Sequence, residues 1–324
     1  MSNIEMINAA ALRAKGIVRR TPLLTSPFLD EIAGRRVFIK AECLQHTGSF
    51  KFRGAWSALS GMAPEDRAKG VLAFSSGNHA QGVALAARMH GTSAVIIMPE
   101  DAPKQKIDNT RALGAEVVLY DRSGEDRDAI GAKLEAERGL MLIKPFDNAF
   151  VIAGQGTTGL EIADQAAEHG VENAQVLVPC GGGGLTSGIA LALAVNAPKM
   201  VVRPCEPEGF DDAIRSLQSG KIEVNAKTSG SICDAIITPS PGEMTFPIMK
   251  NLCQPGAAIS EEACLKTMAH AFTRLKLVVE PGAAVALAAV LFHGNMLPDG
   301  DVIAVVSGGN VDAEMFQRAL SVTV

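Results

Sequence analysis

The hydrophobic and polar positions of this chain change their pattern near residue 70. Beyond that point, four short apolar runs have the composition of buried strands: 71–74, 93–98, 116–120 and 141–144. The segments between them carry apolar residues at helical spacing, at 80–90, 103–113 and 126–138. Strands that alternate with helices predict right-handed crossovers and a parallel sheet. We expect residues 70–147 to form a small, mobile domain.

The rest of the chain, residues 1–69 and 148–324, is expected to form a larger domain. Residues 3–17 have the pattern of an amphipathic helix, residues 21–24 are expected to be extended, and residues 186–195 predict a second helix. Four more apolar runs predict strands, at 37–40, 176–179, 200–203 and 302–306. The pattern therefore predicts an α/β protein with two parallel sheets.

Loops rich in glycine, serine and asparagine follow three of these strands. They comprise residues 75–79, 181–184 and 307–310. Ligands of open parallel sheets bind outside the carboxyl ends of the strands. We therefore expect the three loops to contribute to one shared site.

The glycine run at 181–184 lies between a predicted strand and a predicted helix. Such a loop presents bare backbone N–H groups to an anion, and the helix N-terminus adds a favourable dipole. One interpretation is a dinucleotide-binding loop with Glu206 as the distal acid, but the third glycine of G-x-G-x-x-G is replaced by Thr186 or Ser187. The other interpretation is a cup for the phosphate group of a cofactor.

Lys51 lies between Phe50 and Phe52, after the turn at 47–49 and before a predicted helix. An amine in partly apolar surroundings has its charged form disfavoured, so its pKa falls. The neutral amine is the form that Schiff-base chemistry requires. A lone lysine in this position is more often a surface residue at a helix start, so the assignment of Lys51 depends on the other motifs.

Residues 48–55, Gly-Ser-Phe-Lys-Phe-Arg-Gly-Ala, resemble the lysine motif of the fold-type II pyridoxal-phosphate (PLP) enzymes. The likeness is greatest to the serine/threonine dehydratase and serine racemase branch. The loops at 75–79, 181–184 and 307–310 are similar to that family's motifs and follow its order, so the resemblance covers nearly the whole chain. It implies a tryptophan synthase β-like architecture of two three-layer domains, with PLP carried on Lys51.

The resemblance also implies roles for individual residues. Asn78 would bond the cofactor's ring oxygen, Ser307 would face its pyridine nitrogen, and Ser75, Ser76 and His79 would bind the substrate. Ser76 would also be the second acid/base residue of a racemase, opposite the lysine, although a helix-capping serine is an equal alternative. The residues expected to bind the cofactor are Phe50, Lys51, Asn78, Gly181, Gly182, Gly183, Gly184, Leu185 and Ser307.

An acidic loop follows the predicted strand at 200–203. The carboxylates of Glu206 and Asp212 and the backbone carbonyl of Phe210 are hard oxygen ligands, which suit Mg²⁺, Mn²⁺ or Ca²⁺. Their spacing is similar to that of the divalent-ion site of the eukaryotic-type racemases. A solvated acidic loop is the alternative.

Three cations depart from the most common family pattern. Arg127 falls where racemase-like members carry an arginine near the substrate pocket, Lys144 replaces a histidine, and His46 stands where many members have lysine. Together they are expected to bind a second carboxylate on the substrate. The alternative is that Arg127 is a solvated helix residue.

Composition narrows the functional class and the compartment. A net charge of -5 leaves no basic surface for nucleic acid or anionic membrane. Six cysteines without C-x-x-C spacing indicate reduced thiols in the cytoplasm. The longest apolar run, near residues 282–292, is too short to span a bilayer. We expect a cytoplasmic enzyme that forms a homodimer and takes a small amino acid as its substrate.

The motifs together predict a PLP-dependent ammonia-lyase. It would convert serine, threonine or 3-hydroxyaspartate to a 2-oxo acid and ammonia by α,β-elimination. An amino-acid racemase that uses Lys51 and Ser76 is the alternative. A dinucleotide-binding oxidoreductase and a non-catalytic PLP carrier are more distant hypotheses, which cofactor absorbance and ammonia release would distinguish.

Overall fold

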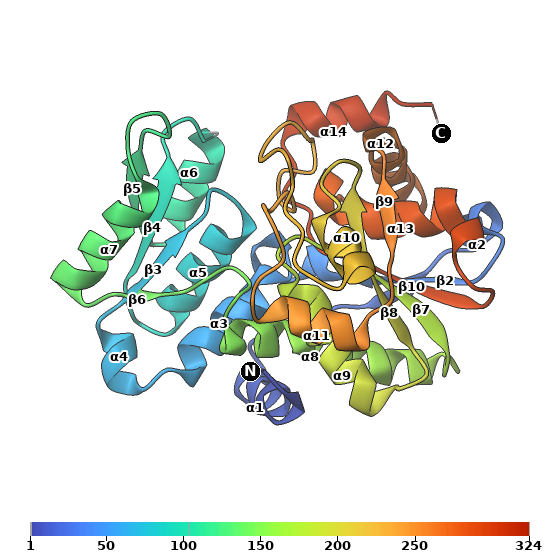
Figure 1. The fold of residues 1–324 in the computed structure, drawn as a ribbon, viewed down its shortest axis with the longest axis horizontal. Helices are drawn as coiled ribbons and strands as arrows, with labels where there is room; N and C mark the ends of the chain where they lie inside the picture. The colour runs from blue at the N-terminus through green and yellow to red at the C-terminus, as the bar shows by residue number, and fades with distance from the viewer. Residues whose placement is uncertain (1, 103, 324) are drawn as a thin grey trace.

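The computed structural model describes residues 2–102 and 104–323, and Figure 1 shows two sheets side by side, each with helices on its faces. The smaller sheet has the strand order β5-β4-β3-β6, and all its strand pairs are parallel. Its strands are β3 (Val71–Phe74), β4 (Ala94–Pro99), β5 (Glu116–Tyr120) and β6 (Met141–Leu142). The predicted parallel sheet is thus confirmed, with a last strand that is two residues shorter than expected.

The larger sheet has the strand order β1-β2-β10-β7-β8-β9. Its strands are β1 (Leu23–Thr25), β2 (Val37–Ala41), β7 (Ala174–Pro179), β8 (Val201–Pro207), β9 (Ala257–Ile259) and β10 (Asp301–Val306). The edge strand β1 runs antiparallel to β2, and the other neighbours are parallel. The central strand β10 comes last in the chain, so the final strand completes the middle of the sheet.

Helices connect the strands and cover both sheets. Around the smaller sheet lie α4 (Pro64–Ala68), α5 (Asn78–Met89), α6 (Lys104–Ala112) and α7 (Arg127–Arg138), and α3 (Lys51–Gly61) lies between the two sheets. The helices of the larger part are α1 (Ile4–Ala14), α2 (Pro27–Ala33), α8 (Ala149–Glu168), α9 (Gly184–Asn196), α10 (Asp212–Ser219), α11 (Thr245–Leu252), α12 (Glu261–His270), α13 (Pro281–His293) and α14 (Ala313–Leu320). Short helical turns are η1 (Glu42–Leu44), η2 (His46–Gly48), η3 (Ala271–Leu275) and η4 (Gly294–Met296).

Successive side chains of a strand lie on opposite faces of its sheet, so each sheet has a separate hydrophobic core on each face. In β2, Val37 and Ile39 pack with α13 on one face, whereas Phe38 packs with α8 and α9 on the other. In β3, Val71 packs towards α3 and α5, and Leu72 towards α7. Each sheet is therefore the middle of three layers, as the family resemblance implied.

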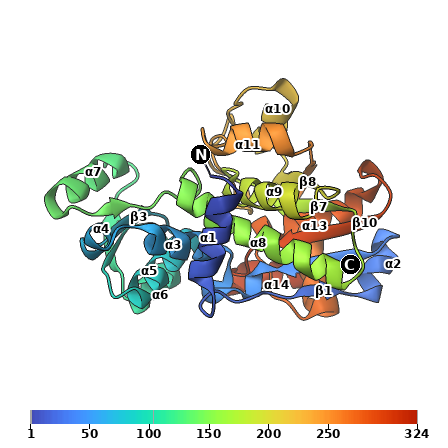
Figure 2. The same cartoon turned by 90° about the horizontal axis from the view of Figure 1, so that it is seen from below.

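Helix α1 lies across α8 and α9 on the outside of the larger part, as Figure 2 shows. Asn3 caps its first turn, because the Asn3 side chain accepts a hydrogen bond from the N–H of Met6. Ile7 and Ala10 then pack against Ala153 and Ala192. The predicted amphipathic helix is confirmed, with slightly narrower limits.

The longest apolar run of the sequence forms α13, which is buried along one face of the larger sheet. Among the described residues, no helix has the length and the apolar character that crossing a membrane requires.

Candidate active site

The three predicted loops and the start of α3 surround one cavity of about 500 Å³. α3 begins at Lys51, α5 begins at Asn78 and α9 begins at Gly184, and the third loop follows β10. The expected cofactor and substrate residues that line the cavity are Phe50, Lys51, Ser75, Ser76, Asn78, His79, Arg127, Gly181, Gly182, Gly183, Gly184, Leu185 and Ser307. Segments far apart in the sequence therefore meet at one site, as the strand-end argument predicted.

Lys51 presents its amine inside this cavity. Its Nζ donates a 2.9 Å hydrogen bond to the carbonyl of Pro145 and lies 5.2 Å from the centre of the Phe50 ring. Burial lowers the pKa of Lys51 to about 8, and the negative charge of Glu280 acts in the opposite direction. A substantial fraction of the amine is therefore neutral near physiological pH, as a nucleophilic amine requires.

The glycine loop is built so that no side chain fits in it. A Cβ atom at Gly182 would overlap with the ring of Phe146. Gly183 has a φ of 89°, in the left-handed region, and a Cβ there would come within 2.6 Å of Met249. Among the described hydrogen bonds, none uses the N–H groups of residues 181–184 as donors. Free donors at the N-terminus of α9 suit a phosphate group.

The loop after β10 is joined directly to the lysine motif. The N–H of Phe50 donates to the carbonyl of Ser307 at 3.0 Å, and the N–H of Gly309 donates to the carbonyl of Gly48 at 2.9 Å. Ser49 and Gly308 form an isolated antiparallel bridge between these two bonds. This short ladder fixes Lys51 relative to the buried Ser307.

Neither serine of the loop after β3 caps the helix that follows it. The N-cap of α5 is Gly77, and no side chain caps this helix. Ser75 Oγ accepts a hydrogen bond from the N–H of Gly77, whereas no hydrogen bond is described for the hydroxyl of Ser76. The helix-capping interpretation of Ser76 is therefore wrong for this structure, and Ser76 is one of the residues that line the cavity.

His79 lines the cavity but is engaged with the backbone. It is 3% exposed, and its Nε2 lies 2.8 Å from the carbonyl of Ile143, so Nε2 carries the proton and donates it. Burial and the charge of Lys51 lower the pKa of His79 to about 3. His79 is consequently neutral and does not act as a cation toward a substrate.

The three cations expected to lie together are separated. Arg127 lines the cavity, with its guanidinium 5.2 Å from the centre of the Phe74 ring and its side chain 49% exposed. Lys144 instead lines a second, more open pocket. His46 packs edge-on against Phe52, and its Nε2 lies 2.9 Å from the carbonyl of Ile17. The expectation of a triple cation site is therefore corrected, because only Arg127 faces the cavity.

Sequence reasoning missed several residues of the cavity. Lys106 of α6 lines it and lies 3.4 Å from Asp234, which belongs to the larger part. Glu280, the residue before α13, accepts a 2.7 Å hydrogen bond from Asn78. An acid directly before the Pro281 that opens an apolar helix was the available signal for Glu280, whereas nothing in the pattern of α6 pointed to Lys106.

The acidic loop lies away from the cavity, at the end of β8. Glu206 and Asp212 are both buried, and Glu206 accepts hydrogen bonds from the N–H groups of Ala213 and Ile214 at 3.0 and 2.8 Å. Asp212 Oδ2 is a buried oxygen without a hydrogen-bond partner. Burial raises the pKa of Asp212 to about 7, and burial together with the charge of Asp212 raises that of Glu206. The loop is not a solvated turn.

The oxygen set in this loop is small. Its third predicted ligand is the carbonyl of Phe210, a buried residue two positions before Asp212. Within residues 2–102 and 104–323, no group of three or more His, Cys, Asp or Glu side chains has an arrangement that could hold a metal ion. Two carboxylates and a carbonyl leave room for water ligands, which Mg²⁺ usually retains.

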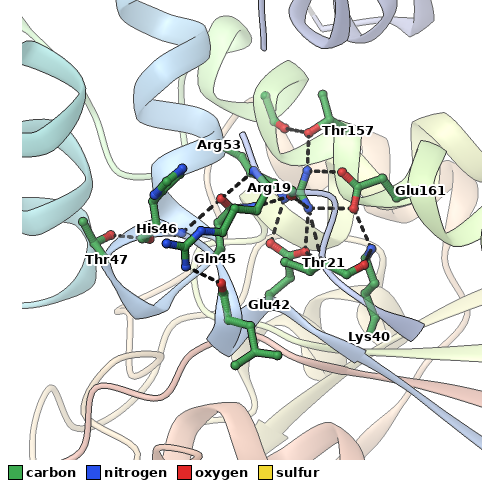
Figure 3. A network of polar contacts seen from close by, with 12 residues as sticks. Arg19, Thr21, Lys40, Glu42, Gln45, His46, Thr47, Arg53, Thr157 and Glu161 are labelled. Atoms are coloured by element: carbon green, nitrogen blue, oxygen red, sulfur yellow. Dashed lines mark hydrogen bonds and ion pairs between the residues drawn. The ribbon is translucent and has the colours of Figure 1, made fainter. Parts of the chain in front are cut away.

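A buried ion network anchors the helix that carries Lys51 (Figure 3). The Arg53 guanidinium donates to both oxygens of Glu42 at 2.7 and 2.8 Å, and to both oxygens of Glu161 at 2.8 Å. Lys40 donates to Glu161 at 2.6 Å. Because two cations face two carboxylates, the charges balance inside the protein, and the first turn of α3 is tied to β2 and α8.

Comparison with known proteins places the chain in one family. It matches the family model "Pyridoxal-phosphate dependent enzyme" over residues 14–308. It is 42% identical over 320 residues to an L-threo-3-hydroxyaspartate ammonia-lyase of Pseudomonas sp, with 99% of each chain covered. It is 40% identical over 316 residues to a serine racemase of Arabidopsis thaliana, with 96% of this chain and 94% of the relative covered.

A solved structure agrees with these sequence matches. The crystal structure of a T.th. threonine deaminase has a TM-score of 0.89 and 47% sequence identity, over 96% of this chain and 99% of that chain. The family and the fold that the lysine motif implied are thus confirmed. Since the matched region includes every motif from Lys51 to Ser307, the chain belongs to the pyridoxal-phosphate dependent enzymes.

Proposed function

We propose that this protein is a PLP-dependent ammonia-lyase that acts on a β-hydroxy-α-amino acid, and that it uses 3-hydroxyaspartate at least as efficiently as serine or threonine. The observation that carries the proposal is the amine of Lys51 in a cavity that also contains a free glycine-loop anion site and the guanidinium of Arg127. The similarity to an L-threo-3-hydroxyaspartate ammonia-lyase supports the same substrate.

The residues around the cavity fit PLP. The unpaired N–H groups of residues 181–184 would hold its phosphate, Asn78 would bond its ring oxygen and Ser307 would face its ring nitrogen. Bound PLP supplies an electron sink for the carbanion that forms when the substrate Cα loses its proton. A neutral hydroxyl at Ser307 holds the ring nitrogen less basic than a carboxylate would, which favours elimination over a long-lived carbanion.

Lys51 would perform the proton transfers. The pKa of its amine lies near the working pH, so the amine can take the Cα proton. Ser75 and the N–H groups of its loop would orient the substrate carboxylate. The β-hydroxyl would be protonated from the phosphate side and leave as water, which balances the proton that Cα gives to Lys51. The enamine released in this way, which is 2-aminoacrylate when the substrate is serine, tautomerises and hydrolyses to a 2-oxo acid and ammonia.

Racemisation is the second candidate function, and one observation favours it. Ser76 lines the cavity, and its side chain does not cap α5. A hydroxyl opposite Lys51 would return a proton to the other face of Cα. The serine racemase relative supports this as a side activity, which chiral analysis of remaining substrate would measure.

Arg127 would select a substrate with a second carboxylate. Burying an extra anion is costly unless a cation meets it. A charge-assisted hydrogen bond contributes roughly 1.5–3 kcal/mol, which corresponds to about a tenfold to hundredfold preference in kcat/KM. We expect 3-hydroxyaspartate to be deaminated at least as efficiently as serine or threonine.

The test compares Arg127→Ala with Arg122→Ala, an exposed arginine of the same part of the chain that pairs with Asp101. Ammonia release from 3-hydroxyaspartate should fall about tenfold or more in Arg127→Ala alone, while release from serine is retained. Equal losses for both substrates would refute the specificity role of Arg127. Absence of ammonia from all three hydroxy amino acids would refute the ammonia-lyase itself.

A divalent cation is proposed for the acidic loop. Glu206 and Asp212 are two buried carboxylates whose pKa values burial raises, and Asp212 Oδ2 has no hydrogen-bond partner, so a cation between them would stabilise both. Glu206, Asp212 and the carbonyl of Phe210 would hold Mg²⁺, Mn²⁺ or Ca²⁺. None of these three residues lines the cavity, so the cation would act on the fold of the loop. The cytoplasmic location and the homodimer stay predictions.

A further inference from the structure

Four polar groups form a continuous chain along one wall of the cavity. Asn78 Nδ2 donates to Glu280 Oε1 at 2.7 Å, and Asn78 Oδ1 accepts from Asn310 Nδ2 at 2.7 Å. Asn310 Nδ2 also donates to the carbonyl of Thr47 at 2.7 Å. The chain joins the loop after β3 to the residue before α13, the loop after β10 and the turn before Lys51.

This chain determines which way the Asn78 amide faces. The carbonyl of Thr47 can only accept, so the nitrogen of Asn310 must face it. The second N–H of Asn310 then requires an acceptor, which is Oδ1 of Asn78. Nδ2 of Asn78 therefore faces Glu280 and keeps one N–H that no described hydrogen bond uses. That N–H is the donor available to a cofactor.

Packing holds both ends of the chain in place. A Cβ atom at Gly48 would come within 2.7 Å of Asn310 Oδ1, and a Cβ at Gly308 would overlap with Glu280 Oε1. Glu280 is 6% exposed, and its N–H donates to the carbonyl of Gly308 at 3.1 Å. The carboxyl group therefore has a fixed position beside the loop of Ser307.

The charges around Glu280 come from several elements. Lys51 at the start of α3 and Lys106 on α6 are positive, and Asp234 is negative. Cys43 on η1 stays a neutral thiol because burial raises its pKa to about 12. Burial raises the pKa of Glu280 to about 7, so the carboxylate is largely ionised above neutral pH and acts on Lys51.

We propose that Glu280 has two separable roles toward bound PLP. With Asn310 it positions the Asn78 amide, so that the free N–H of Asn78 meets the cofactor, and its negative charge holds a proton on the Lys51–cofactor linkage. The inference rests on PLP binding and not on the identity of the substrate.

The test uses PLP-loaded protein without substrate and measures two quantities. A pH titration of the visible absorbance of bound PLP gives the midpoint at which the linkage loses its proton, and equilibrium titration gives the Kd of PLP. Glu280→Gln keeps the acceptor for Asn78 but removes the charge, so the midpoint should fall by about one pH unit while Kd changes less than about threefold. Asn310→Ala should raise Kd about tenfold without moving the midpoint.

Asp234→Asn is the matched charge control. Its side chain is 68% exposed, so the same loss of charge is screened and should move the midpoint by less than half as much. The proposal is also supported if the linkage stays protonated over the whole pH range in the wild type but loses its proton within that range in Glu280→Gln. If the linkage has the same midpoint in the wild type and in Glu280→Gln, or loses its proton in neither protein, the charge role is refuted. An unchanged Kd of PLP in Asn310→Ala refutes the positioning role. A wild type without visible absorbance would instead refute PLP binding itself.

Discussion

Arg53→Met should destabilise the protein strongly, because it removes one cation from the buried ion network. The Arg53 side chain is 1% exposed, and the two carboxylates that it contacts, Glu42 and Glu161, are 0% and 17% exposed. Lys40 would then be the one remaining cation of the network beside two carboxylates. Breaking a buried ion pair from one side costs about 3–5 kcal/mol.

The same substitution at an exposed ion pair provides the control. Arg20 and Glu168 are 2.6 Å apart, with side chains 52% and 60% exposed, and pairs of this kind contribute about 0–1 kcal/mol. Chemical denaturation followed by circular dichroism should therefore separate Arg53→Met from Arg20→Met by at least about 2 kcal/mol. Equal midpoints for the two variants would refute the argument from burial.

The pH dependence of the Arg53→Met effect checks its electrostatic origin. Burial would raise the pKa of Glu42, but the Arg53 guanidinium, together with Lys40 and the Thr21 hydroxyl, lowers it below its ordinary value. A lowered carboxyl pKa contributes stability above the ordinary value, and that contribution is lost as the pH falls through the folded-state pKa. The difference between wild type and Arg53→Met should therefore shrink in acid. A difference that is constant with pH would indicate lost packing alone.

Three further changes test the cofactor site and the acidic loop. Lys51→Ala should abolish the visible absorbance of bound PLP and turnover while circular dichroism stays unchanged, and a variant that retains both would exclude Lys51 as the attachment point. Gly182→Ala should weaken PLP binding at least about tenfold, because the new methyl group meets Phe146; an unaltered Kd would contradict the phosphate cup. Chelation should lower the melting temperature and Mg²⁺ should restore it, more weakly below pH 7, where protons compete for Asp212. A melting temperature that does not change when cations are added to a metal-free sample would contradict the proposed site.

Much of the fold was readable from local pattern. β3 and β4 are apolar runs of strand length between polar turns, so their period and flanks identified them. The buried helix α13 is apolar on all sides and lacks the polar face that marks a surface helix, so its sequence shows no helical period. The long buried part of α8 likewise lacks a polar face, so its sequence does not show a helical period.

Part of the candidate site could likewise be predicted from the sequence, and part could not. β2, β10 and β7 are neighbours in the larger sheet, so topology was sufficient to bring Lys51, Ser307 and the glycine loop at 181–184, which follow these strands, to one edge of that sheet. Asn78 follows β3 of the smaller sheet, and strand order alone does not bring it to Lys51. Side-chain direction does not follow from topology. His46 and Lys144 lie near the motifs in sequence, but neither lines the cavity, whereas Glu280 reaches it from the residue before α13.

The ladder between the lysine motif and the loop after β10 has a consequence for biosynthesis. Thr47 and Asn310, which are hydrogen-bonded, are 263 positions apart, and β10 fills the middle of the larger sheet. A ribosome therefore releases Lys51 long before the strand and the loop that complete its surroundings. A nascent chain that lacks β10 has Lys51 without the Ser307 wall, so we expect stable binding of a cofactor only after the last strand has been translated and inserted.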